Sequence, residues 1–237
     1  RDCLLSRGLG DVYKRQYLEL LDDINSFGTA LYKLGLKNKR VAIIGHNCYK
    51  WAIAHLSNLL GGIVSVPLDK GLQTDELENS LIRSEASAIV FDAKLKDIIE
   101  KIKASNKTNI KHFICFDELP NFLCFNNLLS DGKKEIENGN NEFINCEIDS
   151  YNMSILLFTS GTTSQSKAVM LNQYGIVTNI YDMLLVESFY ETDVNIAFLP
   201  FHHIFGSTGM LVMLAAGLKT VFPDGLRYIC LLYTSDA

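Results

Sequence analysis

The sequence lacks the features that mark membrane, secreted and disulfide-stapled proteins. It has no uninterrupted apolar run of about 18 residues, the length that a membrane-spanning helix requires, and polar side chains interrupt its richest apolar stretch, residues 51–60. Its six cysteines form no Cys-x-x-Cys pair, and a chain of 237 residues does not depend on a disulfide framework. Residues 1–16 lack the apolar centre of a signal peptide. We therefore expect a cytoplasmic protein with reduced thiols and no transmembrane segment.

The overall charge is low and slightly acidic. The formal net charge is -5 and the isoelectric point is near 5.5, and no basic stripe with interleaved aromatic residues is visible. This combination argues against nucleic acid as a partner. Hydrophobic residues make up 48% of the chain and charged residues 21%, which are ordinary values for one large globular domain or two small ones. An anionic ligand would therefore be bound by a local group of residues.

One such group is the stretch 158–169, FTSGTTSQSKAV, which directly follows an apolar run at 153–158. The apolar run predicts a buried strand that delivers the stretch to the edge of a sheet. Backbone N–H groups, hydroxyls and one ammonium group would then face an anion. The residues concerned are Ser160, Gly161, Thr162, Thr163 and Lys167. The order is not that of a Walker A loop, because Ala168 stands where a magnesium-binding hydroxyl is required. The alternative is a surface turn rich in Ser and Thr.

A second segment, residues 198–206, reads FLPFHHIFG. Taken alone, the pair His202 and His203 could be metal ligands, a catalytic base, or polar residues at the start of a helix. Metal is the weakest of these readings, because adjacent residues on a helix point about 100° apart and no Cys, Asp or Glu follows at a ligand-like interval. We therefore expect no metal site in the protein itself.

The two segments, in this order, resemble the adenylate-forming (AMP-binding) superfamily. This group includes acyl-CoA synthetases, luciferases and peptide-synthetase adenylation domains, and its phosphate loop usually reads [ST]-S-G-[ST]-T-G-x-P-K-G. Residues Thr159 to Thr163 and Lys167 match that pattern, whereas Ser164, Ser166 and Ala168 replace a glycine, the proline and the final glycine. The segment 198–206 lies where the family carries a proline, one or two histidines and an aromatic residue.

The resemblance implies an acid-thiol ligase most like a long-chain acyl-CoA synthetase. ATP and a carboxylic acid would give acyl-AMP and pyrophosphate, and CoA would then displace AMP to form the thioester. The cofactors implied are ATP, Mg²⁺ and CoA. Lys167 and His203 would be the catalytic residues, with Thr159 joining the phosphate-binding set. His203, Phe205 and Gly206 would contact the substrate, which is expected to be a fatty acid.

Two other functions remain open on these residues. The first is an adenylation domain that loads an acyl or amino acid onto a carrier protein, since its motifs would look much the same. The second is a catalytically inactive nucleotide-binding or interaction module, which the three departures in the loop favour. The family's later adenine, ribose and lysine motifs would lie beyond residue 229. We therefore expect the chain made alone to be inactive.

The pattern along residues 17–229 predicts an α/β fold, the incomplete large N-terminal domain of such an enzyme, with parallel strands in βαβ layers. Helices are expected at 17–34, 49–60, 74–84, 94–104 and 173–186, and strands at 41–45, 63–66, 88–91, 112–116, 153–158 and 195–199.

The remaining segments are expected to contribute little to the fold or the chemistry. Residues 117–152 are rich in asparagine and are interpreted as a variable connection with a turn at Asp131-Gly132. Asn47 is expected to cap the helix that begins at residue 49. Residues 1–16 and 230–237 resemble adaptor or cloning sequence, so they are set aside from the predicted fold.

Overall fold

The computed structural model describes residues 2–7, 12–159, 166–190 and 192–223. The chain divides into two compact units, which we describe separately. The first unit comprises residues 1–21, 47–49 and 175–237, and the second unit comprises residues 22–46 and 50–174. The predicted loop residues Ser160, Gly161, Thr162 and Thr163 lie outside the described residues.

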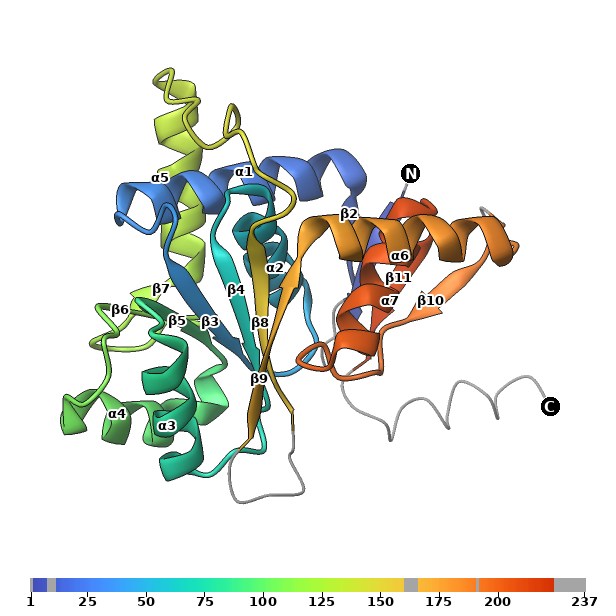
Figure 1. Ribbon diagram of the computed structural model, residues 1–237. Helices are drawn as coiled ribbons and strands as arrows, with labels where there is room; N and C mark the ends of the chain where they lie inside the picture. The colour runs from blue at the N-terminus through green and yellow to red at the C-terminus, as the bar shows by residue number, and fades with distance from the viewer. Residues whose placement is uncertain (1, 8–11, 160–165, 191, 224–237) are drawn as a thin grey trace. The chain divides into compact units, whose positions relative to one another are not determined.

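The second unit is built on a seven-stranded sheet in the order β7-β6-β5-β3-β4-β8-β9 (Figure 1). Strands β3 to β8 of this sheet pair in parallel, and only β9 runs antiparallel to its neighbour. The strands are β3 (Arg40–Ile44), β4 (Val64–Leu68), β5 (Ala88–Phe91), β6 (His112–Cys115), β7 (Leu123–Cys124), β8 (Met153–Thr159) and β9 (Lys167–Asn172). The predicted α/β fold with parallel βαβ layers is therefore confirmed.

Helices cover both faces of this sheet. Side chains alternate along β3, so Ala42 and Ile44 face one layer and Val41 and Ile43 the other, and all four are fully buried. The first layer contains α3 and α4, which lie together beside the sheet (Figure 1). The helices are α1 (Tyr17–Lys33), α2 (Tyr49–Leu60), α3 (Thr74–Ser84), α4 (Lys96–Ser105) and α5 (Phe125–Glu137).

The expectation for residues 117–152 was wrong in one respect, because this segment contains β7 and α5. Phe125, at the start of α5, stacks on Phe27 of α1 with the ring centroids 4.1 Å apart. Gly132 lies inside α5 rather than in a turn. A Cβ atom at this position would come within 1.8 Å of the Ser26 carbonyl oxygen, so the glycine allows α5 to approach the backbone of α1 closely.

The first unit contains a four-stranded sheet in the order β10-β11-β1-β2. Its strands are β1 (Asp2–Arg7), β2 (Val12–Gln16), β10 (Val194–Ile196) and β11 (Lys219–Phe222), and its helices are the greater part of α6 (Gln173–Val186) and α7 (Ile204–Ala215). β1 pairs in parallel with β11, with Leu4 opposite Thr220. Residues 1–16, which were set aside from the predicted fold, thus contribute two strands to this sheet, and their resemblance to adaptor sequence stays a prediction.

The helices were also searched for a membrane span. Within the described ranges, none is both long enough and apolar enough to cross a bilayer.

Candidate functional site

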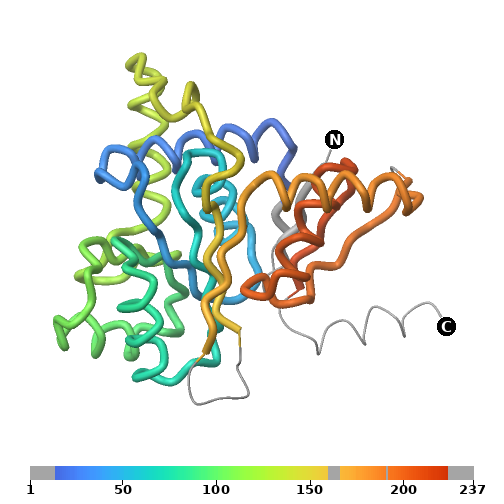
Figure 2. The backbone as a smooth tube through the Cα atoms, in the orientation of Figure 1, coloured from blue at the N-terminus to red at the C-terminus, as the bar shows by residue number. Residues whose placement is uncertain are grey.

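In the second unit, the two ends of the predicted phosphate loop are held side by side. Strands β8 and β9 form an antiparallel hairpin, and Thr159 at the end of β8 pairs with Lys167 at the start of β9. Figure 2 shows the two strands running together to this end of the sheet. Both residues are exposed. The hydroxyl of Thr159 and the ammonium group of Lys167 are thus available at the two ends of the segment that joins the strands.

Arg83 is a cation near this loop that the sequence analysis missed. It lies in the last turn of α3, and its Nη1 donates a hydrogen bond to Ser166 Oγ at 3.1 Å. Its guanidinium group also lies over the ring of Phe158, 5.2 Å from the centroid. Ser166 stands where the family pattern has proline, so its side chain makes a polar contact that a proline could not make. No local sequence signal links residues 83 and 166.

In the first unit, the predicted substrate residues lie at the N-terminus of α7. His203 is the N-cap residue, and its Nδ1 accepts a hydrogen bond from the Phe205 N–H group at 3.4 Å. A neutral ring that accepts at Nδ1 carries its proton on Nε2. Since His203 is exposed, Nε2 can offer that proton to a ligand.

Phe205 and Gly206 differ sharply in exposure. Phe205 is 64% exposed, which suits a residue that contacts a ligand. Gly206 is buried, and a Cβ atom there would come within 2.2 Å of the Pro200 carbonyl oxygen. The observed role of Gly206 is therefore to allow close backbone packing. Lys167 and His203 lie in different units, so each group of candidate residues is described within its own unit.

A polar pair lies at the carboxyl ends of two neighbouring parallel strands of the second unit. His46 follows β3 and Asp92 follows β5, and His46 Nδ1 donates a hydrogen bond to Asp92 Oδ2. Burial alone would raise the pKa of Asp92, but hydrogen bonds from His46 and from the Lys94 N–H group outweigh it and lower the pKa to about 2. Asp92 is thus held as a carboxylate.

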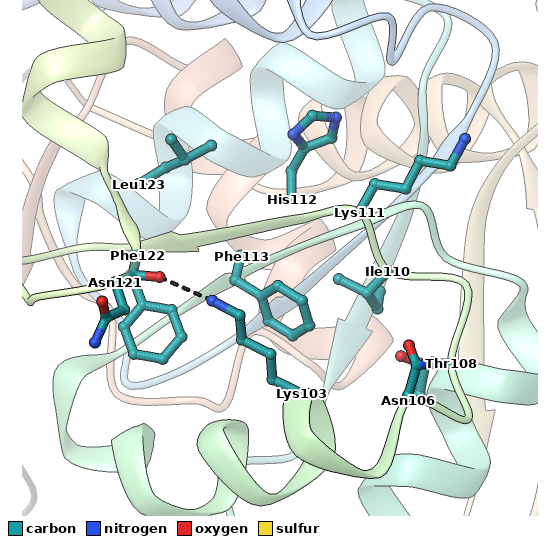
Figure 3. Close-up of a pocket in the computed structure, with 10 residues that line it drawn as sticks. All are labelled: Lys103, Asn106, Thr108, Ile110, Lys111, His112, Phe113, Asn121, Phe122 and Leu123. Atoms are coloured by element: carbon teal, nitrogen blue, oxygen red, sulfur yellow. Dashed lines mark hydrogen bonds between the residues drawn. The ribbon is translucent and has the colours of Figure 1, made fainter.

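A pocket of about 600 Å³ lies elsewhere in the second unit, lined by residues between Lys103 and Leu123. Figure 3 shows that the Lys103 side chain extends between the rings of Phe113 and Phe122. Its ammonium group lies 5.4 and 5.0 Å from the two ring centroids and donates to the Asn121 carbonyl oxygen at 2.9 Å. Lys103 therefore already has partners within the pocket. The residues that line this pocket are far in sequence from the predicted site.

No protein ligand set for a metal emerges in the part of the chain that the structure describes, where no three His, Cys, Asp or Glu side chains gather suitably. If Mg²⁺ takes part, oxygen atoms of the nucleotide phosphates would supply much of its coordination, as is common for this ion.

The fold is that of the N-terminal domain of a class of protein, the adenylate-forming α/β enzymes. The family model of the AMP-binding enzymes matches residues 4–229, and the chain belongs to this family. Its match includes residues of β1 and β2.

Known proteins of this kind are similar over most of the chain. Fatty acyl-CoA synthetase A of Dictyostelium discoideum is 28% identical over 95% of this chain and 35% of its own length. A mitochondrial medium-chain acyl-CoA ligase of Danio rerio is 25% identical over 90% of this chain and 39% of its own length. The structure of ATP-bound MatB from Rhodopseudomonas palustris superposes with a TM-score of 0.77 at 22% identity, over 99% of this chain and 45% of that chain. The chain thus spans less than half the length of each of these proteins.

Proposed function

We propose that this chain is part of an ATP-dependent acyl-activating ligase. It would bind the phosphates of ATP and orient the carboxylic acid. A carboxylate oxygen attacks the α-phosphorus of ATP, and the bond to the bridging oxygen of pyrophosphate breaks. The thiolate of CoA then attacks the acyl carbon of acyl-AMP and AMP leaves. A fatty acid is the substrate that we propose, because one relative named above is a fatty acyl-CoA synthetase and another is a medium-chain acyl-CoA ligase.

The observation that carries this proposal is the pairing of Thr159 with Lys167 at the end of the β8–β9 hairpin. Negative charge grows on pyrophosphate as it leaves, and a fixed ammonium group with nearby hydroxyls stabilises that charge. Lys167 and Thr159 would hold the β- and γ-phosphates together with Ser160, Gly161, Thr162 and Thr163. Arg83, through Ser166, would hold the base of the loop in place.

His203 has a separate task in this proposal. Its Nε2–H group would donate to an oxygen of the substrate carboxylate, while the hydrogen bond at Nδ1 keeps the ring in that tautomer. Phe205 would form part of the wall of the acyl or CoA path, and Gly206 would act through its packing. Mg²⁺ would neutralise phosphate charge when bound, and none of the steps assigned to these residues depends on it.

The experiment is ATP–pyrophosphate exchange by the full-length protein with acids of graded chain length. We expect exchange that depends on a fatty acid, followed by thioester formation with free CoA. Thioester formation only on the phosphopantetheine of a carrier protein would favour a carrier-loading domain instead. Absence of exchange with every acid, together with failure to bind an acyl-adenylate mimic, would indicate an inactive module. The cytoplasmic location also stays a prediction, which cell fractionation would test.

A further inference from the structure

The segment that leads to His203 is held by the side chain of one distant residue, Asn47. Its Nδ2 donates hydrogen bonds to the carbonyl oxygens of Ala197 at 2.8 Å and Leu199 at 2.7 Å. Its Oδ1 accepts a hydrogen bond from the Phe201 N–H group at 3.1 Å. One amide thus satisfies three backbone groups on both sides of Pro200. All of these residues belong to the first unit.

These contacts give Asn47 a role other than the expected helix cap. An asparagine amide offers two N–H donors and one acceptor oxygen, and both donors and the oxygen are engaged with this segment. Aspartate could accept from Phe201 but would bring a carboxylate against two carbonyl oxygens. Alanine would remove all three bonds. The chemistry therefore specifies asparagine at this position.

The path of this segment determines where α7 begins. The His203 N–H group donates to the Pro200 carbonyl oxygen at 3.1 Å. Gly206, in the first turn of α7, packs so closely on Pro200 that a Cβ atom would not fit. Phe201 is buried and its ring meets Phe222 edge to face, with the centroids 6.0 Å apart. A shift of the backbone at Leu199 to Phe201 would therefore move the His203 ring.

We propose that Asn47 is a positioning residue for His203, acting through residues 197–201 without touching the substrate. The catalytic consequence rests on the proposed function of His203, whereas the effect on the segment does not. Misplacing a positioning group by about 1 Å can lower a rate by about 100-fold. The loss should appear in the use of the acid and leave the use of ATP unchanged, because Lys167 and its loop lie in the other unit.

The test compares Asn47→Ala and Asn47→Asp with a matched control in the full-length protein. The control is Asn195→Ala, which removes another asparagine of the same unit whose Nδ2 donates to Thr220 Oγ1 at 3.4 Å. Hydrogen exchange is measured at the Phe201 amide, and ATP–pyrophosphate exchange gives kcat and KM for the acid and for ATP. We expect hydrogen exchange at the Phe201 amide to be about 10-fold faster or more in Asn47→Ala, which removes the acceptor oxygen, and to change less in Asn47→Asp, which keeps one. We also expect kcat/KM for the acid to fall about 10- to 100-fold, with KM for ATP within about twofold of wild type. The control should match the wild type in both measurements.

The double variant Asn47→Ala/His203→Ala separates positioning from a general structural effect. If Asn47 acts through His203, the double variant is no slower than His203→Ala alone. Unchanged hydrogen exchange at Phe201 in Asn47→Ala would overturn the proposal. Faster hydrogen exchange with unchanged acid kinetics would also overturn it, as would fully additive losses in the double variant. If His203→Ala itself leaves the acid kinetics unchanged, the proposed function of His203 fails. Hydrogen exchange at Phe201 then still decides whether Asn47 holds residues 197–201.

Discussion

His55 should make the folded protein lose stability in mild acid. It lies in α2 with 0% exposure, its ring centroid is 5.0 Å from that of Trp51, and its Nδ1 is 2.8 Å from Ser65 Oγ. Nε2 is buried without a hydrogen-bond partner among the described residues. Burial penalises the charged ring and lowers the pKa of His55 from 6.5 to about 3.

The sign and size of the effect follow from this difference. Between pH 6.5 and pH 3 the unfolded chain binds a proton at His55 that the folded chain does not bind. Stability from this group is therefore fully present above pH 6.5 and is lost as the pH falls toward 3. Each pH unit inside this window changes the free energy of unfolding by about 1.4 kcal/mol. The loss between pH 7 and pH 5 should be about 2 kcal/mol.

The assay is urea unfolding at several pH values, followed by the fluorescence of Trp51, the only tryptophan of the chain. His55→Gln should lose about 2 kcal/mol less than the wild type between pH 7 and pH 5. His112 needs its own variant, His112→Gln, because burial also lowers its pKa and acts in the same direction. Equal pH dependence in wild type and His55→Gln would refute the reasoning, as would an NMR titration of His55 with a midpoint near 6.5.

Three further predictions concern other contacts of the structure. His46→Ala should raise the pKa of Asp92, because burial is then opposed by fewer hydrogen bonds, and carboxyl NMR should show this higher pKa. The stability that Asp92 contributes above about pH 4 should then fade at a higher pH than in wild type. Gly132→Ala should lower the free energy of unfolding by about 2 kcal/mol or more. Gly209→Ala, which has open space at its Cβ, should be neutral or stabilising by up to about 1 kcal/mol. Urea midpoints that move equally in the two variants would contradict this. Arg83→Ala should raise KM for ATP about fivefold, because the hydrogen bond to Ser166 at the end of the loop is lost. An unchanged KM would show that Arg83 does not support ATP binding.

The regular parts of the fold could be predicted because local patterns determine them. The helices 49–60, 74–84 and 173–186 and the strand 88–91 were predicted with the bounds that the structure has. α5 was missed because Phe125 and Gly132 are its only buried residues, which is too sparse for helical periodicity. An Asp-Gly pair is also typical of turns, and only the contact with α1 explains the glycine inside a helix.

Candidate site residues could be selected from the sequence only where consecutive residues carry the signal. Thr159, Lys167 and His203 stand in short motifs, so their order in the sequence was sufficient to select them. Arg83 and Asn47 make hydrogen bonds to residues 83 and at least 150 positions away, and such partners are set by the fold alone. Backbone pairing of β1 with β11 is invisible in the sequence for the same reason.

The central claim is that Lys167 binds the β- and γ-phosphates of ATP, which leave as pyrophosphate. The most direct measurement is ATP–pyrophosphate exchange by the full-length protein with Lys167→Ala, beside Lys133→Ala, which removes an exposed lysine of α5. Loss of a charge-assisted hydrogen bond predicts a fall in kcat/KM for ATP of about 10- to 100-fold in Lys167→Ala and no change in Lys133→Ala. Equal exchange in Lys167→Ala and wild type would contradict the account.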